Sequence, residues 1–549
     1  MRKTDDFSSY ISKFLGGSYD CVDRVSIRGC FPLGLTSGGM VTWWERLHPG
    51  VEISEQALRA MAADFGRRVQ AYARQNAIPL ERCEPGDREK HVRVEKARPE
   101  DPAFMGVFRI MVTRAPGLVW RVWRGKSGRP VVRRPKNWPL INHYHFHLVD
   151  REWGHVAIRM SGHPPFGLQI NVNGHEWVQR QAAQQGVTTV KAQNCFVGGS
   201  QMEALSALAA QLDGDHGLAH LATLIDRWVY SACLCFGLAL EEQKRSGFVY
   251  RYSCAQIEYS RNLLFKSGRR LDQIYQGLIE RTRLLLDVPR LKTIFGRKNR
   301  PHYKRKGGGR LEKVIERSTY DLTVFKLHFG KLTLKMYDKG DRVLRIEVVV
   351  ANTTELRCGK LLERLPGMLA KLEEMAVRFL AVVQAAHTSF LDAGLIEHLS
   401  RPSRRGTQRV AGVNLEKRRM RAVSEGVLAL AAAPRGFTAL ELSRRIRQQQ
   451  GRKLRAYNPR KAAYDLRKLR GKALIERIGK TRRYRLRRPG IRTLAGLYIL
   501  HEKVIKPVLT GACRPKRGRP PKSIAPLDIH YTRLQKEMLA TFQSLHLAA

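Results

Sequence analysis

The sequence predicts a mixed α/β fold of the α+β kind, in which two small antiparallel β regions alternate with helices. Apolar and polar residues alternate over about 140–178 and again over 320–350, as in strands. Apolar residues recur every three to four positions over 200–290 and 360–398, as in helices. A chain of 549 residues is too long for one core, so three or four domains are expected.

The first 139 residues are expected to form an N-terminal α/β region. CVDRVSIRGCF alternates as a strand does, and EQALRAMAADFGRRVQAYARQ has the spacing of an amphipathic helix. A Pro- and Arg-rich break over 125–139 ends the region.

The start, MRKTDDFSSY, lacks the apolar core of a signal peptide, and no apolar run has the length of a membrane span. Nine cysteines without a CxxC pair indicate reduced thiols, so a cytoplasmic protein is expected.

Residues 140–400 are expected to form a central α+β body. Its first strand turns at DREWG and returns as HVAIRMSG, and LQINVNG follows as a third strand. The helical segment includes CAQIEYSRNLLF, and a basic glycine-rich loop over 295–310 offers Arg297 and Lys298 to nucleic acid. TVFKLHF, LTLKMYD and VLRIEVVV then predict a meander.

Positive charge is the strongest functional signal. The chain has 99 Lys and Arg against 48 Asp and Glu, a formal net charge of +51. Such an excess repels itself in a folded protein and favours a polyanionic partner, because each neutralised phosphate releases counterions. Nothing in the sequence resembles a basic amphipathic membrane anchor, so nucleic acid and not a membrane is the expected partner.

Basic residues are densest after a linker over 401–425. GFTALELSRRIRQQ predicts one helix, Asn458-Pro459 marks the start of a second, and short strands are expected over 474–478 and 484–486. This pattern over 426–495 resembles the winged helix-turn-helix of MarR-like regulators, with Lys472-Ala473 in place of the family's glycine. The resemblance implies a helix in the major groove and a wing on the backbone, although a protein-binding winged helix stays open. The expected nucleic-acid contacts are Arg460, Lys461, Arg467, Lys468, Arg470, Lys480, Arg482, Arg483 and Arg485.

Residues 496–549 are expected to form a C-terminal helix and a basic arm. The stretch PKRGRPPK is similar to the core of the AT-hook, which implies that Arg517, Gly518 and Arg519 lie in an AT-rich minor groove. A plain basic linker is the alternative. An AT-hook would favour duplex DNA over RNA.

The stretch INHYHFHLVD places His143, His145 and His147 on one face of the first central strand. If DREWG closes a hairpin, Arg159 lies beside these histidines, in a position to contact phosphate. His145-Phe146-His147 is similar to the metal-binding motif of HUH endonucleases. That resemblance implies a divalent metal on the histidines and a tyrosine nucleophile from a helix. A structural or RNA-contacting face is the alternative.

The segment KMYDKGDRVLRIE is similar to the YDK and LRxE pair of rolling-circle replication initiators. The resemblance implies that Asp338 and Glu347 bind metal and that Lys339 and Arg345 contact phosphate at the reacting centre. Tyr259, in a polar cluster with Glu258, is the leading candidate nucleophile, with Tyr252 and Tyr275 as alternatives. The alternatives are a core tyrosine and a cross-strand ladder of salt bridges.

The order of several motifs also resembles a family of bacterial proteins that end in a winged helix. The shared pieces are His143-Tyr144, Asn173 to Trp177, Gln256 to Tyr259 and Tyr337 to Glu347. This resemblance implies no particular activity.

The leading hypothesis is a cytoplasmic, nucleoid-associated DNA-binding protein that nicks DNA with a tyrosine and Mg²⁺ or Mn²⁺, as replication initiators and mobile-element proteins do. One alternative is a non-catalytic winged-helix transcriptional regulator without a cofactor. Another is an RNA-binding component of a ribonucleoprotein. Single-stranded DNA and RNA therefore remain candidate ligands beside duplex DNA.

Overall fold

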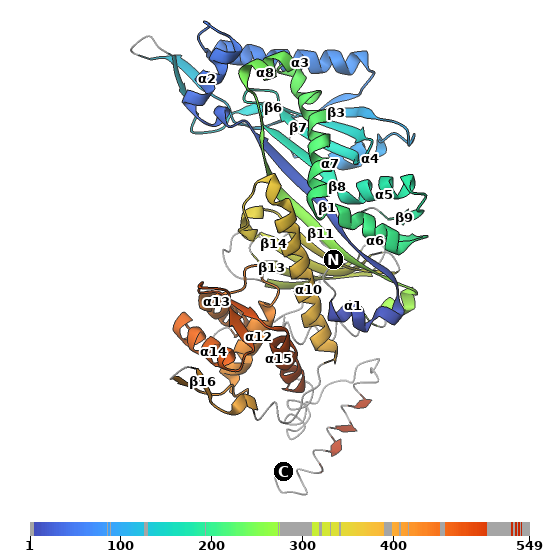
Figure 1. Cartoon of the computed structure of the whole chain (residues 1–549), viewed down its shortest axis with the longest axis vertical. Helices are drawn as coiled ribbons and strands as arrows, with labels where there is room; N and C mark the ends of the chain where they lie inside the picture. Colours follow the sequence, from blue (N-terminus) through green and yellow to red (C-terminus); the bar gives the residue numbers. More distant parts are fainter. Residues whose placement is uncertain are drawn as a thin grey trace.

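The body of the protein is built on a single mixed sheet of eleven strands, in the order β12-β13-β14-β15-β11-β1-β8-β7-β6-β3-β2 (Figure 1). The computed structural model describes residues 5–84, 86–87, 89–125, 130–192, 194–272, 274, 310–317, 321–329, 331–339, 342–388, 398–405, 408–415, 417–450 and 456–501, with a few residues between 529 and 540. The mixed α/β class is confirmed. The expectation of two separate small β regions is wrong, because both regions belong to this one sheet.

Two long central strands join the β regions. β1 (Leu15–Cys30) pairs with β11 (Arg251–Phe265) on one side and with β8 (Leu168–Asn173) on the other. The helix expected over CAQIEYSRNLLF is wrong, since these residues form β11. A central strand is covered on both faces and so loses the simple apolar–polar alternation that identifies a half-buried strand.

The histidine-bearing meander forms as expected. β6 (Leu140–Asp150) pairs with β7 (Gly154–Ser161), which pairs with β8, all antiparallel. The DREWG turn closes the first hairpin, where the Asp150 carboxylate accepts from the backbone N–H groups of Glu152 and Trp153. β3 (Gly106–Pro116) and β2 (Leu80–Cys83) complete this edge, and β2 runs parallel to β3.

The second predicted meander forms the other edge. It consists of β12 (Arg310–Arg317), β13 (Asp321–Phe329), β14 (Leu332–Lys339) and β15 (Val343–Val350), and β15 pairs with β11. The strands expected over TVFKLHF, LTLKMYD and VLRIEVVV are confirmed.

Helices pack on both faces of the central strands. α5 (Gly174–Gln184) and α6 (Met202–Gln211) contact β1, while α10 (Leu365–Thr388) contacts β11 and β15 and meets α1 (Asp6–Tyr10). Other helices of the body, shown in Figure 1, are α2 (Ser37–Leu47), α3 (Glu55–Gln75), α4 (Lys90–Lys96), α7 (Asp215–Ile225) and α8 (Leu240–Ser246). α3 confirms the helix expected from its apolar spacing.

No individual helix in the described part of the chain combines the length and the apolar character needed to cross a membrane. One pair bent by 95°, Asp215–Phe236 with Leu240–Ser246, meets that criterion only when its two parts are taken together.

A smaller C-terminal unit follows the body. It contains α12 (Arg418–Ala429), α13 (Ala439–Gln450), α14 (Pro459–Gly471), the hairpin of β18 (Ile475–Arg477) and β19 (Tyr484–Leu486), and α15 (Arg488–Leu500). Asn458 caps α14 by accepting from Lys461 N–H at 3.0 Å, which confirms the predicted helix start. α15 packs against α10 and so attaches the unit to the body.

Gly174 allows α5 to begin directly against β1. A Cβ atom added at Gly174 would lie 1.9 Å from the carbonyl oxygen of Val22. Asn173 caps the helix at this point, since its Oδ1 accepts from His175 N–H at 2.9 Å. The Asn-Gly-His sequence therefore places His175 against the central strand.

Replacing Gly174 with alanine is expected to lower the free energy of unfolding by about 1–3 kcal/mol, because the added methyl group must displace α5 or β1. Urea denaturation measures the change. Gly167→Ala is the matched control, since nothing lies within 4 Å of its added Cβ. Equal stabilities of the two variants would show that α5 does not depend on this close approach.

Candidate functional site

The predicted histidine face forms on β6 and has the expected neighbours. His143, His145 and His147 lie opposite Ser161, Arg159 and Ala157 of β7. His145 Nε2 lies 2.9 Å from Thr113 Oγ1, and His147 Nδ1 lies 3.2 Å from His155 Nε2. These contacts give His145 and His147 protein partners, whereas both ring nitrogens of His143 are buried without a hydrogen-bond partner among the described residues.

Burial keeps these imidazoles neutral. It lowers the pKa of His143 and of His145 to about 4 each, and the Arg159 guanidinium adds to both shifts. Burial and the neighbouring His155 lower the pKa of His147 to about 3. Burial also lowers the pKa of Arg159, which is only partly exposed between these histidines and Gln169.

The five predicted metal ligands do not form one site. Six strand spacings separate β6 from β14, which carries Asp338, and five separate β6 from β15, which carries Glu347. At about 4.8 Å per spacing, these gaps are roughly 29 Å and 24 Å. The histidine face and the YDK and LRxE strands therefore lie in different parts of the sheet, and no single ion reaches both.

The LRxE strand instead joins a buried network on the face of the sheet toward α5. Arg345 Nη2 lies 2.6 Å from Asp23 Oδ2, and Nη1 donates to Asn262 Oδ1 at 3.0 Å and to the Asn194 carbonyl at 3.1 Å. The Ser260 hydroxyl donates to Asp23 Oδ1 at 2.7 Å. We call these residues, with His175 and Glu347, the Asp23–Arg345 network.

Strand register brings these residues together. Asn262 lies opposite Arg345, and Ser260 lies opposite Glu347, so all four share one face of β11 and β15. The register of β1 on β11 shifts between Val22 and Arg24, which makes Asp23 the extra residue of a bulge. Asp23 keeps the alternation of Tyr19 and Cys21, which lie opposite Asn262 and Ser260, and so it faces Arg345.

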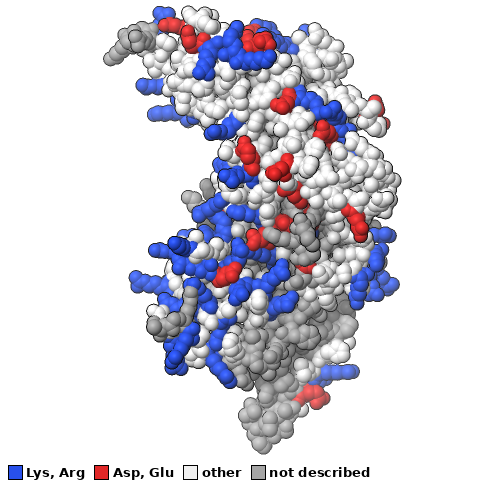
Figure 2. Space-filling view, in the orientation of Figure 1, with Lys and Arg blue, Asp and Glu red and all other residues white. Residues whose placement is uncertain are grey.

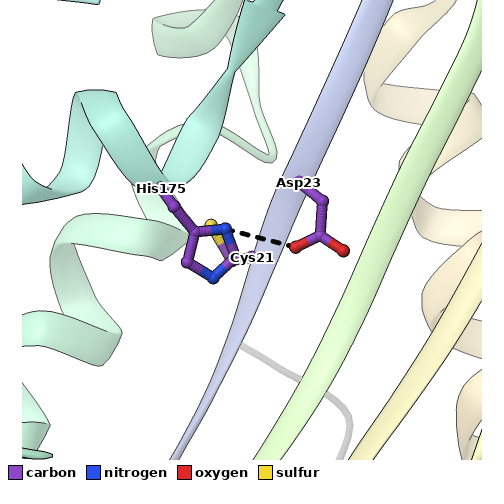
Figure 3. A group of neighbouring side chains, drawn as sticks. All are labelled: Cys21, Asp23 and His175. Atoms are coloured by element: carbon purple, nitrogen blue, oxygen red, sulfur yellow. Dashed lines mark ion pairs between the residues drawn. The ribbon is translucent and has the colours of Figure 1, made fainter. Parts of the chain in front are cut away.

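His175 reaches the network from the N-terminus of α5. Figure 3 shows its ring facing the Asp23 carboxylate across the gap between α5 and β1, with Nδ1 3.2 Å from Asp23 Oδ1. Its Nε2 lies 3.3 Å from the Tyr19 hydroxyl, which accepts from Phe196 N–H at 2.7 Å. The sequence places His175 in a motif but does not reveal its partner Asp23.

Burial dominates the electrostatics of this network. It raises the pKa of Asp23 to about 7, although the Arg345 guanidinium opposes the shift, and it lowers the pKa of His175 well below its usual range. The pKa of Arg345 is raised by Asp23, Tyr337 and Glu347 against the cost of burial. Burial raises the pKa of Glu347, but Lys335 at 2.8 Å and then Arg345 outweigh this effect and lower it overall.

Three members of this region have the chemistry of metal ligands. The thiol of Cys21, the carboxylate of Asp23 and the imidazole of His175 have ligand atoms within 4.8 Å of one another (Figure 3), a donor set that suits Zn²⁺. Asp23, however, already has a cation beside it, the Arg345 guanidinium. The other such group in the described residues is Glu81, Cys83 and Asp87, whose carboxylates face Arg93 and Arg109. Neither group contains a predicted metal ligand.

A second buried network lies on the opposite face of the same strands and contains Tyr259. The Tyr259 hydroxyl donates to Asp20 Oδ2 at 3.0 Å, and Arg261 pairs with both Asp20 at 2.6 Å and Asp5 at 2.7 Å. Arg261 also lies 3.9 Å from Glu373 of α10. This network connects the start of the chain, both central strands and α10.

The candidate nucleophile is therefore inside the protein. Tyr259 is 1 % exposed and lies on a strand, not on the helix that the HUH resemblance implies. Glu258 accepts from Gln256 Nε2 at 2.8 Å, and Lys339 Nζ donates to Asn194 Oδ1 at 2.7 Å. Tyr259 lies on the opposite face of β11 from Glu258, so the three predicted catalytic side chains do not meet at one site.

Several predicted nucleic-acid contacts lie on the open face of the C-terminal unit. Arg460, Lys461 and Arg467 are exposed on α14, while Leu466 and Leu469 on its other face are buried. Lys480 and Arg482 are exposed in the turn between β18 and β19. Arg470 is half-buried near the end of α14.

Four predicted contacts are positioned differently. Arg345 is completely buried and out of reach of a phosphate, and Lys468 is 8 % exposed with Asp465 at 3.7 Å. Arg483 and Arg485 are half-buried and pair with Glu441 at 3.4 Å and with Glu374 of α10 at 3.3 Å. These ion pairs hold the hairpin against α13 and α10. Another group of predicted contacts lies outside the described residues: Arg297, Lys298, Arg517, Gly518 and Arg519.

Two shallow hollows on this part of the protein are lined by arginine. One, of about 430 Å³, is bordered by Arg488 and Arg492 of α15. The other, of about 370 Å³, is bordered by Arg404 and Arg409 of the hairpin β16 (Ser403–Arg405) and β17 (Gln408–Val410). The β16–β17 hairpin packs on α14, so basic residues continue from α14 onto its neighbour.

The histidine face is expected to make the fold sensitive to acid. Because burial lowers the pKa values from 6.5 to about 4, the folded state binds fewer protons than the unfolded chain between these values. Stability is then fully present above pH 6.5 and falls as the pH drops toward 4. In the variant in which glutamine replaces His143, His145 and His147, the free energy of unfolding should fall by at least about 2 kcal/mol less between pH 6.5 and pH 4. Urea titrations at several pH values measure this difference. His91→Gln, at an exposed position on α4, is the control, and an unchanged pH profile of the triple variant would contradict the assignment.

Arg345→Met is expected to lower the free energy of unfolding by about 3–5 kcal/mol at neutral pH, because Asp23 would lose its buried counter-charge. Adding Asp23→Asn should recover part of the loss, since it removes the uncompensated carboxylate. Chemical denaturation of the single and double variants measures the coupling. Additive losses would show that the two residues contribute independently.

Comparisons with known proteins supply no relative for this chain. No family model matches it, and neither a curated protein nor a solved structure matches it. The resemblances to MarR-like regulators and to replication initiators therefore stay predictions. The function of the chain has to be inferred from its own residues.

Proposed function

We propose that this protein binds duplex DNA through its C-terminal unit, and that α13, α14 and the β18–β19 hairpin act as a winged helix. α14 would enter the major groove, and the β18–β19 turn would contact the backbone beside it. The observation that carries the proposal is the set of exposed, uncompensated cations on α14 and on this turn.

The open face of α14 has the composition of a phosphate- and base-contacting surface. Within the described part of the chain, no carboxylate pairs with Arg460 or Arg467, and Tyr464 is 43 % exposed between them. The opposite face is anchored by buried Leu466 and Leu469 and by Asp465, which accepts from Tyr457 at 3.0 Å. The helix is thus held firmly, while Arg460 and Arg467 have no carboxylate partner among the described residues.

The β18–β19 turn adds a second group of cations. Gly479 has a φ of +53°, a left-handed conformation that glycine adopts at low cost, and Lys480 and Arg482 project from the same turn. Arg477 donates to the carbonyl of Lys480 at 2.8 Å and so stiffens the turn. A stiff basic turn next to a basic helix matches the shape of a groove and its flanking phosphates.

Positive surface charge is concentrated on the C-terminal unit. In Figure 2, Lys and Arg side chains crowd over this unit, while more of the carboxylates lie on the body. Residues 401–500 contain 29 Lys and Arg against 5 Asp and Glu. A local excess of this size attracts a polyanion over a range set by the salt concentration.

The positions of the candidate catalytic residues favour a protein that binds DNA without cleaving it. The candidate nucleophile Tyr259 is buried, and the histidine face is about five or six strand spacings from Glu347 and Asp338. A nickase needs its tyrosine and its metal ligands beside the same phosphate. We therefore propose a DNA-binding protein whose body supports the C-terminal unit.

Neutralising the open face of α14 should weaken duplex binding. The triple variant Arg460→Gln, Lys461→Gln, Arg467→Gln is expected to bind a labelled duplex at least about tenfold more weakly near 150 mM salt, measured by fluorescence anisotropy. The slope of log K against log salt should fall by about one for each phosphate that the variant no longer neutralises.

The matched control removes three exposed cations from the body, with Arg68→Gln, Arg74→Gln and Lys244→Gln, and should leave duplex affinity within about twofold. Equal reductions in affinity in both triple variants would show that the loss reflects only the lower net charge of the protein and not the position of the cations on α14. Binding of RNA but not of DNA by the unaltered protein would overturn the assignment to DNA.

A further inference from the structure

We propose that the β4–β5 hairpin, with the tryptophan that follows it, is a second nucleic-acid-binding surface that takes unpaired bases. β4 (Arg121–Arg124) pairs with β5 (Pro130–Arg133), and Trp138 lies between β5 and β6. We call Arg121 to Arg124, Pro130 to Arg133 and Trp138 the tryptophan hairpin. It lies far along the sheet from the C-terminal unit and is not part of the winged helix proposed above.

Alternation gives the hairpin an inner and an outer face. Val122 and Val132 face each other across the strands, are buried and belong to the main core. Trp123 and Arg133 therefore point outward, and the Arg133 guanidinium lies 5.9 Å from the centre of the Trp123 ring. An indole beside a guanidinium forms a flat cationic surface on which a base can stack.

The two outward tryptophans are exposed to an unusual degree. Trp123 is 46 % exposed and Trp138 is 56 % exposed, whereas Trp120 at the base of the hairpin is 4 % exposed and donates to the Gly34 carbonyl at 3.0 Å. Exposing two large aromatic side chains costs hydrophobic free energy. This cost is recovered if a partner stacks on the rings.

The charge around these rings selects the partner. The described residues of this stretch, 118–125 and 130–139, contain five Lys and Arg and no Asp or Glu. Arg124, Arg133 and Lys136 are exposed, and no described carboxylate pairs with them. Aromatic rings among uncompensated cations suit a single-stranded nucleic acid, whose phosphates meet the cations while its bases stack on the rings.

The hairpin is anchored well enough to present this surface. Arg121 donates to Glu55 of α3 at 2.5 Å, and Arg134 donates to the carbonyl of Leu35 and lies 5.0 Å from the Trp120 ring. In Figure 1 the hairpin projects beside α2 on the same side of the view as α13 and α14, and Figure 2 shows the outline hollowed between these two lobes. One nucleic acid could thus touch both surfaces along this side.

The decisive variant is Trp123→Ala combined with Trp138→Ala. It should bind a labelled single-stranded oligothymidylate about tenfold more weakly for each ring that stacks, or about 1.4 kcal/mol per ring. Duplex affinity should change by less than about twofold, because duplexed bases offer no free face to the rings. Trp123→Phe with Trp138→Phe should retain most of the affinity, since each position keeps an aromatic ring.

Met105→Ala with Val249→Ala is the control for exposed apolar surface, because these side chains are 57 % and 62 % exposed elsewhere on the body. Unchanged single-strand affinity in the double Trp→Ala variant overturns the proposal, and so does binding to anionic phospholipid vesicles that needs the two tryptophans. Loss of duplex binding in the α14 triple variant with retention of single-strand binding would separate the two surfaces. Absence of binding to any nucleic acid by the unaltered protein would refute both proposals.

Discussion

The ion pair between Asp23 and Arg345 is the contact on which the centre of the sheet depends. Taking both charges out of water costs several kcal/mol per ion, and their attraction offsets this cost only when the geometry is good and the remaining polar atoms are satisfied. Ser260, Asn262 and the Asn194 carbonyl supply further bonds, and among the described residues only Nε of the Arg345 guanidinium is left without one. The pair can therefore form only when β1, β11 and β15 are in their native register.

The second network explains why the same strands are polar on both faces. Asp20, Tyr259 and Arg261 form their own bonds toward α1 and α10, behind the Asp23–Arg345 network. A slip of one residue between β1 and β11 would move every one of these side chains to the wrong face and leave charges unpaired. We interpret the two networks as devices that specify register in a long central ribbon, where apolar side chains alone would tolerate a shift.

The buried arginines of the body are paired with carboxylates, whereas many exposed cations on the surface are not. Inside the sheet, the buried guanidinium groups of Arg345 and Arg261 each have a carboxylate within 3 Å. By contrast, no described carboxylate pairs with Arg460 and Arg467 of α14, with Lys480 and Arg482 of the β18–β19 turn, or with Arg124 and Arg133 of the tryptophan hairpin. Residues 401–500, with 29 Lys and Arg against 5 Asp and Glu, thus carry nearly half of the net charge of +51, on a unit whose open face a polyanion can reach.

Local features could be predicted from the sequence alone. These features depend on the spacing of apolar residues and on turn and capping residues, all of which act over a few positions. They are the three-stranded histidine meander with its cross-strand neighbours, the second meander, α3 and the start of α14. β11 was the exception, because a strand buried on both faces has no clear period. Only the tertiary structure decided that Arg345 meets Asp23 and not a phosphate, that Tyr259 is buried, and that the histidines lie five or six strand spacings from Glu347 and Asp338. Those outcomes follow from strand order, which brings together residues hundreds of positions apart and which no local pattern encodes.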